Sequence, residues 1–164
     1  MAIYEKDGTE IRPKGDLEYI CPIGGEFDET KVVLCAYSKQ LDKQEVSNLL
    51  EVAPTKAWNP NEPHPMGNKE RIRVVDWGKW SFECSTPVSV EQQIEILLSQ
   101  CTNNLEHWRL LTEKYEVWLS VVGYLHNWNR ELDLSSRVLR LLVDRNLALK
   151  VDVYFYRDRE EGAI

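Results

Sequence analysis

Segments with strand-like and helix-like hydrophobic patterns alternate along the chain from Lys31 to Tyr156. Residues 32–37 form a short apolar run of strand-forming residues, which is typical of a buried strand. Between residues 89 and 101, apolar side chains recur at intervals of three and four, which predicts an amphipathic helix. Each of these apolar faces has to be buried against another element. The pattern therefore favours a domain in which helices pack on a sheet.

The predicted order of elements is strand, helix, hairpin, long helix with a short companion, strand, helix and strand. The hairpin is predicted to join 71–74 to 79–84 through the turn 76–78, and the last strand covers 147–156. The apolar face of the hairpin is expected to carry Ile72, Val74, Trp80, Phe82 and Cys84. We expect an α+β fold, a ferredoxin-like sandwich whose mixed or antiparallel sheet has its helices packed on one face.

Polar residues mark the predicted helix ends. Asp42 stands three residues before Glu45, and Ser89 three residues before Gln92, a spacing typical of a capping box. Asn104 is placed to start the short companion helix, and Asp133 or Ser135 the last one. Asn146 fits a C-terminal cap.

Residues 53–70 interrupt this regularity and are predicted to be a long loop, because proline, glycine and asparagine recur through them. Long loops in compact domains are commonly functional or mobile. Trp58 and His64 are the unusual residues of this one. The Trp58 ring is expected either to pin the loop to the core or to anchor a partner.

The acidic residues are concentrated at the N-terminus. Residues 1–31 hold eight acidic and four basic residues, so they carry −4 of the net charge of −7. We expect an acidic arm over 1–31 and a single α+β domain over 32–164. The arm is either a solvated tail, an extra strand near 17–21, or an acidic edge that meets a basic partner through Glu26, Asp28 and Glu29.

Composition excludes several classes of protein. The acidic balance argues against unselective nucleic-acid binding, and no apolar run approaches the roughly 20 residues that a membrane-spanning helix needs. No secretory signal is visible, so we expect a cytoplasmic protein. The four cysteines are widely spaced and show no Cys-x-x-Cys pair, which predicts reduced structural thiols and no metal site.

No motif indicates catalysis. A serine elbow, a glycine-rich phosphate loop and a His-Glu-x-x-His helix are all missing, and His64, His107 and His126 are isolated from one another. We therefore expect no enzymatic activity, no catalytic residue and no cofactor.

Aromatic residues are frequent, with six tryptophans and seven tyrosines. Trp80 and Trp108 fall on predicted core faces. Trp118, Tyr154 and Tyr156 fall on the opposite faces of their strands, where they would form an aromatic strip if the two strands are neighbours. Such a strip could be covered by the arm or the loop, could recognise a protein, or could line a small-molecule cleft.

Four features together resemble the bacterial family of domain of unknown function 4279. They are the opening strand followed by residues 41–50, the pair Pro54-Thr55, the segment 78–82, and the closing strand 147–156. The resemblance covers residues 32–156. It implies a small cytoplasmic protein without an assigned reaction, and small bacterial families of this sort often include immunity proteins encoded beside toxins.

These observations lead to the hypothesis of a non-enzymatic immunity protein, a monomer or weak dimer that binds and neutralises a bacterial toxin. Glu26, Asp28 and Glu29 would approach a basic toxin surface. The contact residues on the toxin-facing side would be Trp58, His64, Trp118 and Trp128. The rival hypothesis is a small-molecule-binding or enzymatic domain with a pocket under the 53–70 loop, and a third is an accessory domain that tunes an assembly.

Overall fold

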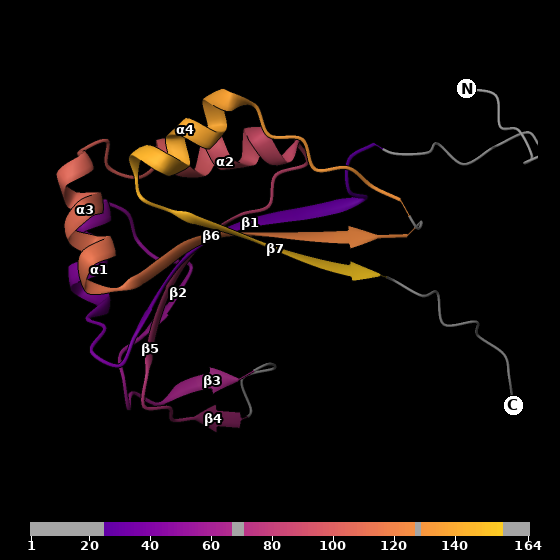
Figure 1. Cartoon of the computed structure of the whole chain (residues 1–164). Coiled ribbons are helices and arrows are strands. Elements are labelled where there is room, and N and C mark those ends of the chain that lie inside the picture. Colours follow the sequence, from indigo (N-terminus) through magenta and orange to yellow (C-terminus); the bar gives the residue numbers. More distant parts are fainter. Residues whose placement is uncertain (1–24, 67–70, 127–128, 156–164) are drawn as a thin grey trace, which may run out of the picture.

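The computed structural model describes residues 25–66, 71–126 and 129–155 (Figure 1). A five-stranded sheet carries four helices, and a separate two-stranded ribbon lies beyond one end of the sheet. The elements in chain order are β1 (Glu29–Ser38), α1 (Lys43–Leu50), β2 (Lys56–Trp58), β3 (His64–Met66), β4 (Arg71–Arg73), β5 (Gly78–Cys84), α2 (Val90–Ser99), α3 (Leu105–Lys114), β6 (Glu116–Leu125), α4 (Ser136–Asp144) and β7 (Ala148–Phe155).

The strands of the main sheet lie in the order β2-β5-β1-β6-β7. All neighbours are antiparallel except β6 and β7, which are parallel and are connected through α4. The structure thus confirms the predicted α+β sandwich with a mixed sheet.

The core lies between the helices and one face of the sheet. Val32, Leu34 and Ala36 of the central strand β1 all point to this face and are buried. Trp80 and Trp108 are completely buried among them, as their positions in the sequence predicted. Because successive strand residues alternate between faces, the other half of each strand forms a second face, which none of the described helices covers; we call it the helix-free face.

The helices begin where local sequence predicted. Asp42, Ser89, Asn104 and Ser135 each accept backbone N–H groups of the first turn, and Ser89 and Gln92 complete a capping box. Asn146 follows α4 with a φ of 53°, the left-handed conformation of a C-terminal cap. In the described ranges, no helix is long and apolar enough to cross a membrane.

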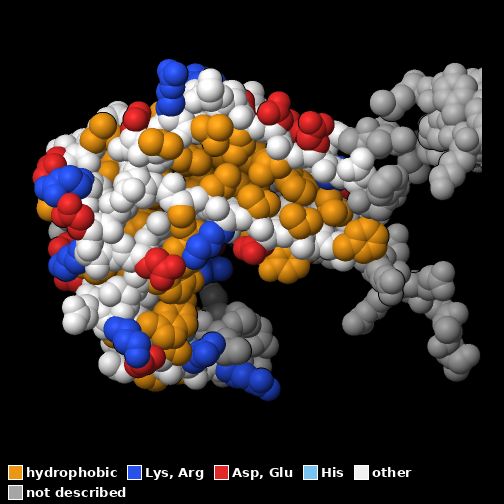
Figure 2. Space-filling view, in the orientation of Figure 1, with side chains coloured by type: hydrophobic (Ala, Val, Ile, Leu, Met, Phe, Trp, Pro, Cys, Tyr) orange, Lys and Arg blue, Asp and Glu red, His pale blue; other side chains and the backbone are white. Residues whose placement is uncertain are grey.

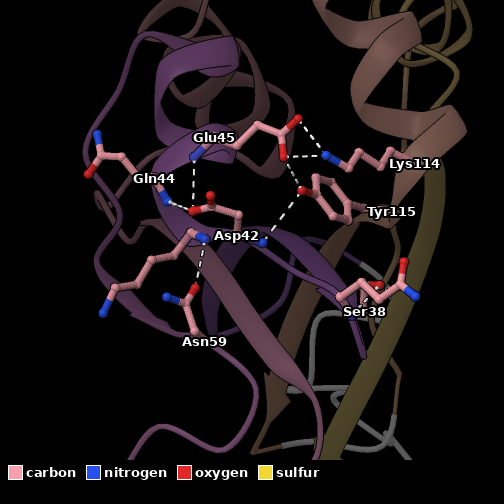
Figure 3. Close-up of polar contacts among 9 residues, drawn as sticks. Ser38, Asp42, Gln44, Glu45, Asn59, Lys114 and Tyr115 are labelled. Atoms are coloured by element: carbon pink, nitrogen blue, oxygen red, sulfur yellow. Dashed lines mark hydrogen bonds and ion pairs between the residues drawn. The ribbon is translucent and has the colours of Figure 1, made fainter.

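Glu45 does not close a capping box with Asp42. Its carboxylate instead lies against Lys114 Nζ at 2.5 Å and accepts a hydrogen bond from the Tyr115 hydroxyl (Figure 3). These contacts connect α1 to the end of α3, and they lower the pKa of Glu45. The network around Asp42 in Figure 3 therefore links α1 to α3.

The predicted hairpin between 71–74 and 79–84 is wrong. β4 pairs with β3, whereas β5 lies between β1 and β2. A strand has only two edges, and both edges of β5 are occupied by these other partners. Ile72 and Val74, which were expected on the buried face, are consequently 73% and 57% exposed.

Two further boundaries differ from expectation. The predicted loop 53–70 contains the short strands β2 and β3, which pair with β5 and β4. β1 begins at Glu29, inside the predicted acidic arm, and residues 1–24 of that arm lie outside the described residues. Cys35, Cys84 and Cys101 are buried free thiols, as predicted, while Cys21 lies outside the described residues.

Candidate binding surface

Four small, buried side chains lie on the helix-free face of the sheet. Ser81, Cys35, Val33 and Ser120 point to this face from β5, β1 and β6, and all four are buried. Burial raises the pKa of the Cys35 thiol, so the thiol is protonated at neutral pH and contributes apolar surface. Larger side chains surround these four residues.

Five rings lie in one continuous series on this side of the molecule, which we call the aromatic row: His64, Trp58, Trp77, Tyr37 and Trp118. The centroids of His64 and Trp58 are 4.0 Å apart, and their rings are stacked. Trp77 follows at 5.6 Å from Trp58 and 5.2 Å from Tyr37. Tyr37 is stacked on Trp118 at 4.9 Å. All five rings are half-buried, so each keeps surface for a further contact.

Two lysines accompany the row. Lys79 Nζ lies 5.5 Å from the centroid of Tyr37 and 5.7 Å from that of Trp58. Lys150 Nζ lies 3.3 Å from the centroid of Trp118. Such cation–π contacts contribute about 0.5–2 kcal/mol each, depending on exposure. The row therefore combines stacking surface with positive charge.

The turn at residues 59–62 positions Trp58 and His64. The backbone N–H of Lys43 donates to Asn59 Oδ1 at 2.9 Å, and Lys43 Nζ lies 2.6 Å from the Glu62 carboxylate. Glu62 also accepts the backbone N–H of Asn59, and these contacts lower its pKa. The start of α1 thus holds the turn that separates β2 from β3.

Gly78 allows a close approach beside the row. A Cβ atom at this position would lie 2.8 Å from the Leu41 Cβ, and 3.0 Å from both Pro60 Cδ and the Trp58 carbonyl oxygen. Only glycine therefore lets β5 begin so near to β2, because these neighbours include backbone and a rigid proline ring.

Trp58 has one unsatisfied group. Its indole Nε1 is buried and has no hydrogen-bond partner among the described residues. A buried indole N–H normally finds an acceptor. Figure 2 shows a notch between the sheet and the β3–β4 ribbon.

The three acidic residues of the predicted binding set lie at the other end of β1. Glu26 and Glu29 are exposed and line a cleft of about 690 Å³ between the start of β1 and the segment before α2. Asp28 is engaged within the protein: its carboxylate lies 2.5 Å from Arg130 and accepts the His126 N–H at 2.8 Å. These bonds lower the pKa of Asp28.

The structure thus separates the predicted binding residues into two groups. Trp58, His64 and Trp118 belong to the aromatic row, and Glu26, Asp28 and Glu29 lie at the opposite end of the sheet. Glu29 and Tyr37 are eight residues apart on one extended strand, which corresponds to about 26 Å. Trp128 lies outside the described residues.

Sequence reasoning missed Tyr37, Trp77, Lys79 and Lys150. Tyr37 shares the alternation of Val33 and Cys35, so the strand pattern carried a signal for its face. Trp77 had been placed in a hairpin turn that does not form. The expected pairing of the strands that carry Trp118 and Tyr154 is confirmed, since β6 pairs with β7, and both residues point to the helix-free face. They do not form one strip, because Trp118 lies opposite Ala148 whereas Tyr154 lies opposite Tyr124 and is stacked on it. Tyr156 lies outside the described residues.

The fold and the aromatic row define a small α+β sandwich protein with a candidate binding surface on the helix-free side of its sheet. A family model described as "Domain of unknown function (DUF4279)" matches residues 28–156, most of the chain, and the protein belongs to this family. The match includes all of β1 and ends one residue beyond β7. No curated protein and no solved structure matches the chain.

Proposed function

We propose that this protein acts by binding another protein through the aromatic row, and that it is an immunity protein which neutralises a bacterial toxin. The observation that carries the proposal is the continuous series of five half-buried rings on a sheet face without helices. Tryptophan, tyrosine and other aromatic residues dominate the energetics of protein interfaces. The choice of a toxin as the partner rests on the class of family alone, because small bacterial families of this kind often include immunity proteins.

The row suits protein recognition for a physical reason. Its rings already contact one another and the flanking lysines, so they lose little conformational freedom when a partner covers them. The exposed part of each ring provides apolar surface for contact with the partner. Lys79 and Lys150 offer charge to carboxylates or carbonyl groups of the partner.

Glu26 and Glu29 have a separate role in this proposal. Neither carboxylate has an ion pair in the described part of the chain. Exposed charges of this kind accelerate the encounter with a basic partner, and salt screens their effect. Asp28 is left out of this role, because its carboxylate neutralises Arg130.

Binding to the toxin encoded by the adjacent gene tests the proposal. We expect the full chain to bind that protein, and Trp77→Ala or Trp118→Ala to weaken binding by roughly 30-fold, the effect of losing about 2 kcal/mol at a hot spot. Leu110→Ala is the matched control, since Leu110 is an exposed apolar residue on α3, away from the row. Wild-type affinity in both tryptophan variants, or no binding of the neighbouring protein, would refute the proposal.

The acidic residues are tested by association rate. We expect the Glu26→Lys and Glu29→Lys double variant to associate more slowly with the toxin at low salt and at an unchanged rate at high salt. Asp144→Lys, an acid-to-base change at the end of α4, serves as the control. An unchanged rate at low salt would remove the acidic residues from the binding mechanism.

The unsatisfied Trp58 indole favours a second candidate function, the binding of a small molecule beside β2. A ligand with a carbonyl or carboxylate oxygen would accept the Nε1 hydrogen and stack on the neighbouring rings. Thermal unfolding in the presence of carboxylate metabolites tests this function. A compound that raises the melting temperature of the wild type should raise that of Trp58→Phe less, because phenylalanine has no N–H group.

A further inference from the structure

β7 presents an unpaired edge. It is the last strand of the sheet and pairs only with β6 among the described strands. Its apolar residues Val151, Val153 and Phe155 point toward the helix side and are 41%, 52% and 55% exposed. A long, exposed, apolar edge strand is a template for pairing with another chain.

The exposed apolar surface continues from β7 onto α4. Val138 and Leu142 of α4 face the core, whereas Leu139 and Val143 are 44% and 74% exposed. Figure 2 shows a continuous hydrophobic area that runs from α4 along β7. Monomeric proteins rarely expose contiguous apolar patches of this kind, and such patches mark interaction sites.

We propose that the protein forms a two-fold symmetric dimer in which β7 pairs antiparallel with β7 of a second copy, with Val151 opposite Val151. The two sheets would then join into one ten-stranded sheet. The α4 helices of both copies would lie on the same side of it, next to each other. The assembly would cover the apolar edge and the exposed side of α4 together.

The charges of β7 specify this register. A two-fold axis perpendicular to the sheet places residues of the same face opposite each other. With Val151 at the axis, Lys150 lies opposite Asp152 of the second copy, and this ion pair occurs twice. With Lys150 or Asp152 at the axis, like charges would face each other instead, which is unfavourable.

The apolar residues agree with the same register. With Val151 at the axis, Leu149 lies opposite Val153 of the second copy on the helix side, and Ala148 lies opposite Tyr154 on the other side. Each large side chain therefore meets an apolar partner. In this register the strand is self-complementary in its charges and in its apolar residues on both of its faces.

Asp152 has no cationic partner among the residues that the structure describes. Its carboxylate accepts a hydrogen bond from the Ser120 hydroxyl at 3.3 Å, and no ion pair to it occurs in the described ranges. Lys150 is exposed and reaches Glu116 at 3.3 Å. A Lys150 side chain from a second copy would supply the missing positive charge beside Asp152.

Charge-swapped variants test the dimer and its register. Light scattering with size-exclusion chromatography should show the full chain with twice the mass of one copy at high concentration. Lys150→Asp and Asp152→Lys should each shift the protein to the monomer, because each places two like-charge pairs across the interface. An equimolar mixture of the two variants should restore the dimer, since both cross-strand pairs are then of opposite charge.

Lys56→Asp is the matched control, because it changes the same charge on the other edge strand, β2, and should leave the dimer intact. A wild type that stays monomeric at all concentrations would overturn the proposal. So would single variants that dimerise like the wild type, or a mixture that remains monomeric. Monomeric wild type whose toxin binding is lost in Val153→Asp would assign the β7 edge to the toxin instead.

Discussion

Lys150 and Trp118 form a cation–π pair across the parallel strands β7 and β6, with the ammonium 3.3 Å from the ring centroid. Glu116 lies 3.3 Å from the same ammonium group. The lysine is therefore placed between a carboxylate and an aromatic face of the neighbouring strand. This pair connects the edge strand β7 to one end of the aromatic row.

Removing the ammonium should weaken that connection. We expect Lys150→Met to lower the free energy of unfolding by about 0.5–1 kcal/mol, since the methionine keeps apolar contact with the ring and loses the charge. Urea unfolding of dilute protein, followed by tryptophan fluorescence, measures the change. Lys39→Met is the control, because among the described residues the Lys39 ammonium pairs with the exposed Asp76 and contacts no aromatic ring. Equal effects in the two variants would argue against the cation–π contribution.

Ser47 supports the largest core residue. Its hydroxyl oxygen accepts the indole N–H of the fully buried Trp80 at 2.9 Å. Ser47→Ala leaves this donor unpaired in the core, and we expect a loss of about 1–3 kcal/mol in the free energy of unfolding. The same substitution in a Trp80→Phe background should cost clearly less, because no N–H remains to be satisfied. A double-mutant cycle without coupling would contradict this interpretation.

Gly78→Ala should disturb the aromatic row. The added methyl group meets Leu41, Pro60 and the Trp58 carbonyl, so we expect a loss of about 1–3 kcal/mol and an altered near-ultraviolet circular dichroism spectrum. Gly123→Ala is a matched control, because its methyl group meets the Phe27 ring, which lies outside the row. We expect Gly123→Ala to lose stability without changing the near-ultraviolet signal of the aromatic row. Identical spectra for the wild type and Gly78→Ala would contradict the prediction.

Asp28 should contribute to stability in a pH-dependent manner. Its pKa is lowered by Arg130 and the His126 N–H, so it is lower in the folded than in the unfolded protein. Its contribution is therefore complete above the ordinary aspartate pKa of about 3.9 and is lost as the pH falls through the lower folded value. We expect Asp28→Asn to lower the melting temperature at pH 7 and to converge with the wild type toward pH 2. Parallel curves for wild type and Asp28→Asn over this pH range would disprove the linkage.

The buried thiols should resist alkylation in the native protein. Burial raises the pKa of Cys35, and that of Cys101 to about 12, so neither forms the reactive thiolate near pH 8. Iodoacetamide labelling followed by peptide mass spectrometry should modify both residues only after denaturant is added. Rapid native labelling of either cysteine would show that its surroundings open to solvent.

Helix ends were predictable because their signals are local. Asp42, Ser89, Asn104 and Ser135 bond to backbone groups two or three residues away, so a short stretch of sequence contains both partners. The apolar run of residues 32–37 likewise predicted the buried strand β1. The overall sandwich of helices on a sheet follows from such segments, because each has one apolar face to bury.

Strand partners were less predictable because they depend on distant residues. Residues 71–74 alternate like a half-buried strand, yet β1 and β2 take both edges of β5 and leave this segment to pair with β3. The aromatic row was unpredictable for the same reason, because it also depends on contacts between residues that are distant in the sequence. The strand order β2-β5-β1-β6 aligns Trp58, Tyr37 and Trp118, while His64 joins the row from β3 and Trp77 from the residue before β5.

The central place of β1 has a consequence for folding kinetics. Cys35 lies opposite Ser81 on one side and Trp118 on the other, 46 and 83 positions further along the chain. The first of the described strands therefore pairs only after both of its neighbours have been synthesised, and most of the sheet closes through long loops. Domains dominated by such distant pairings fold in roughly milliseconds to seconds, so this protein should fold slowly for its size.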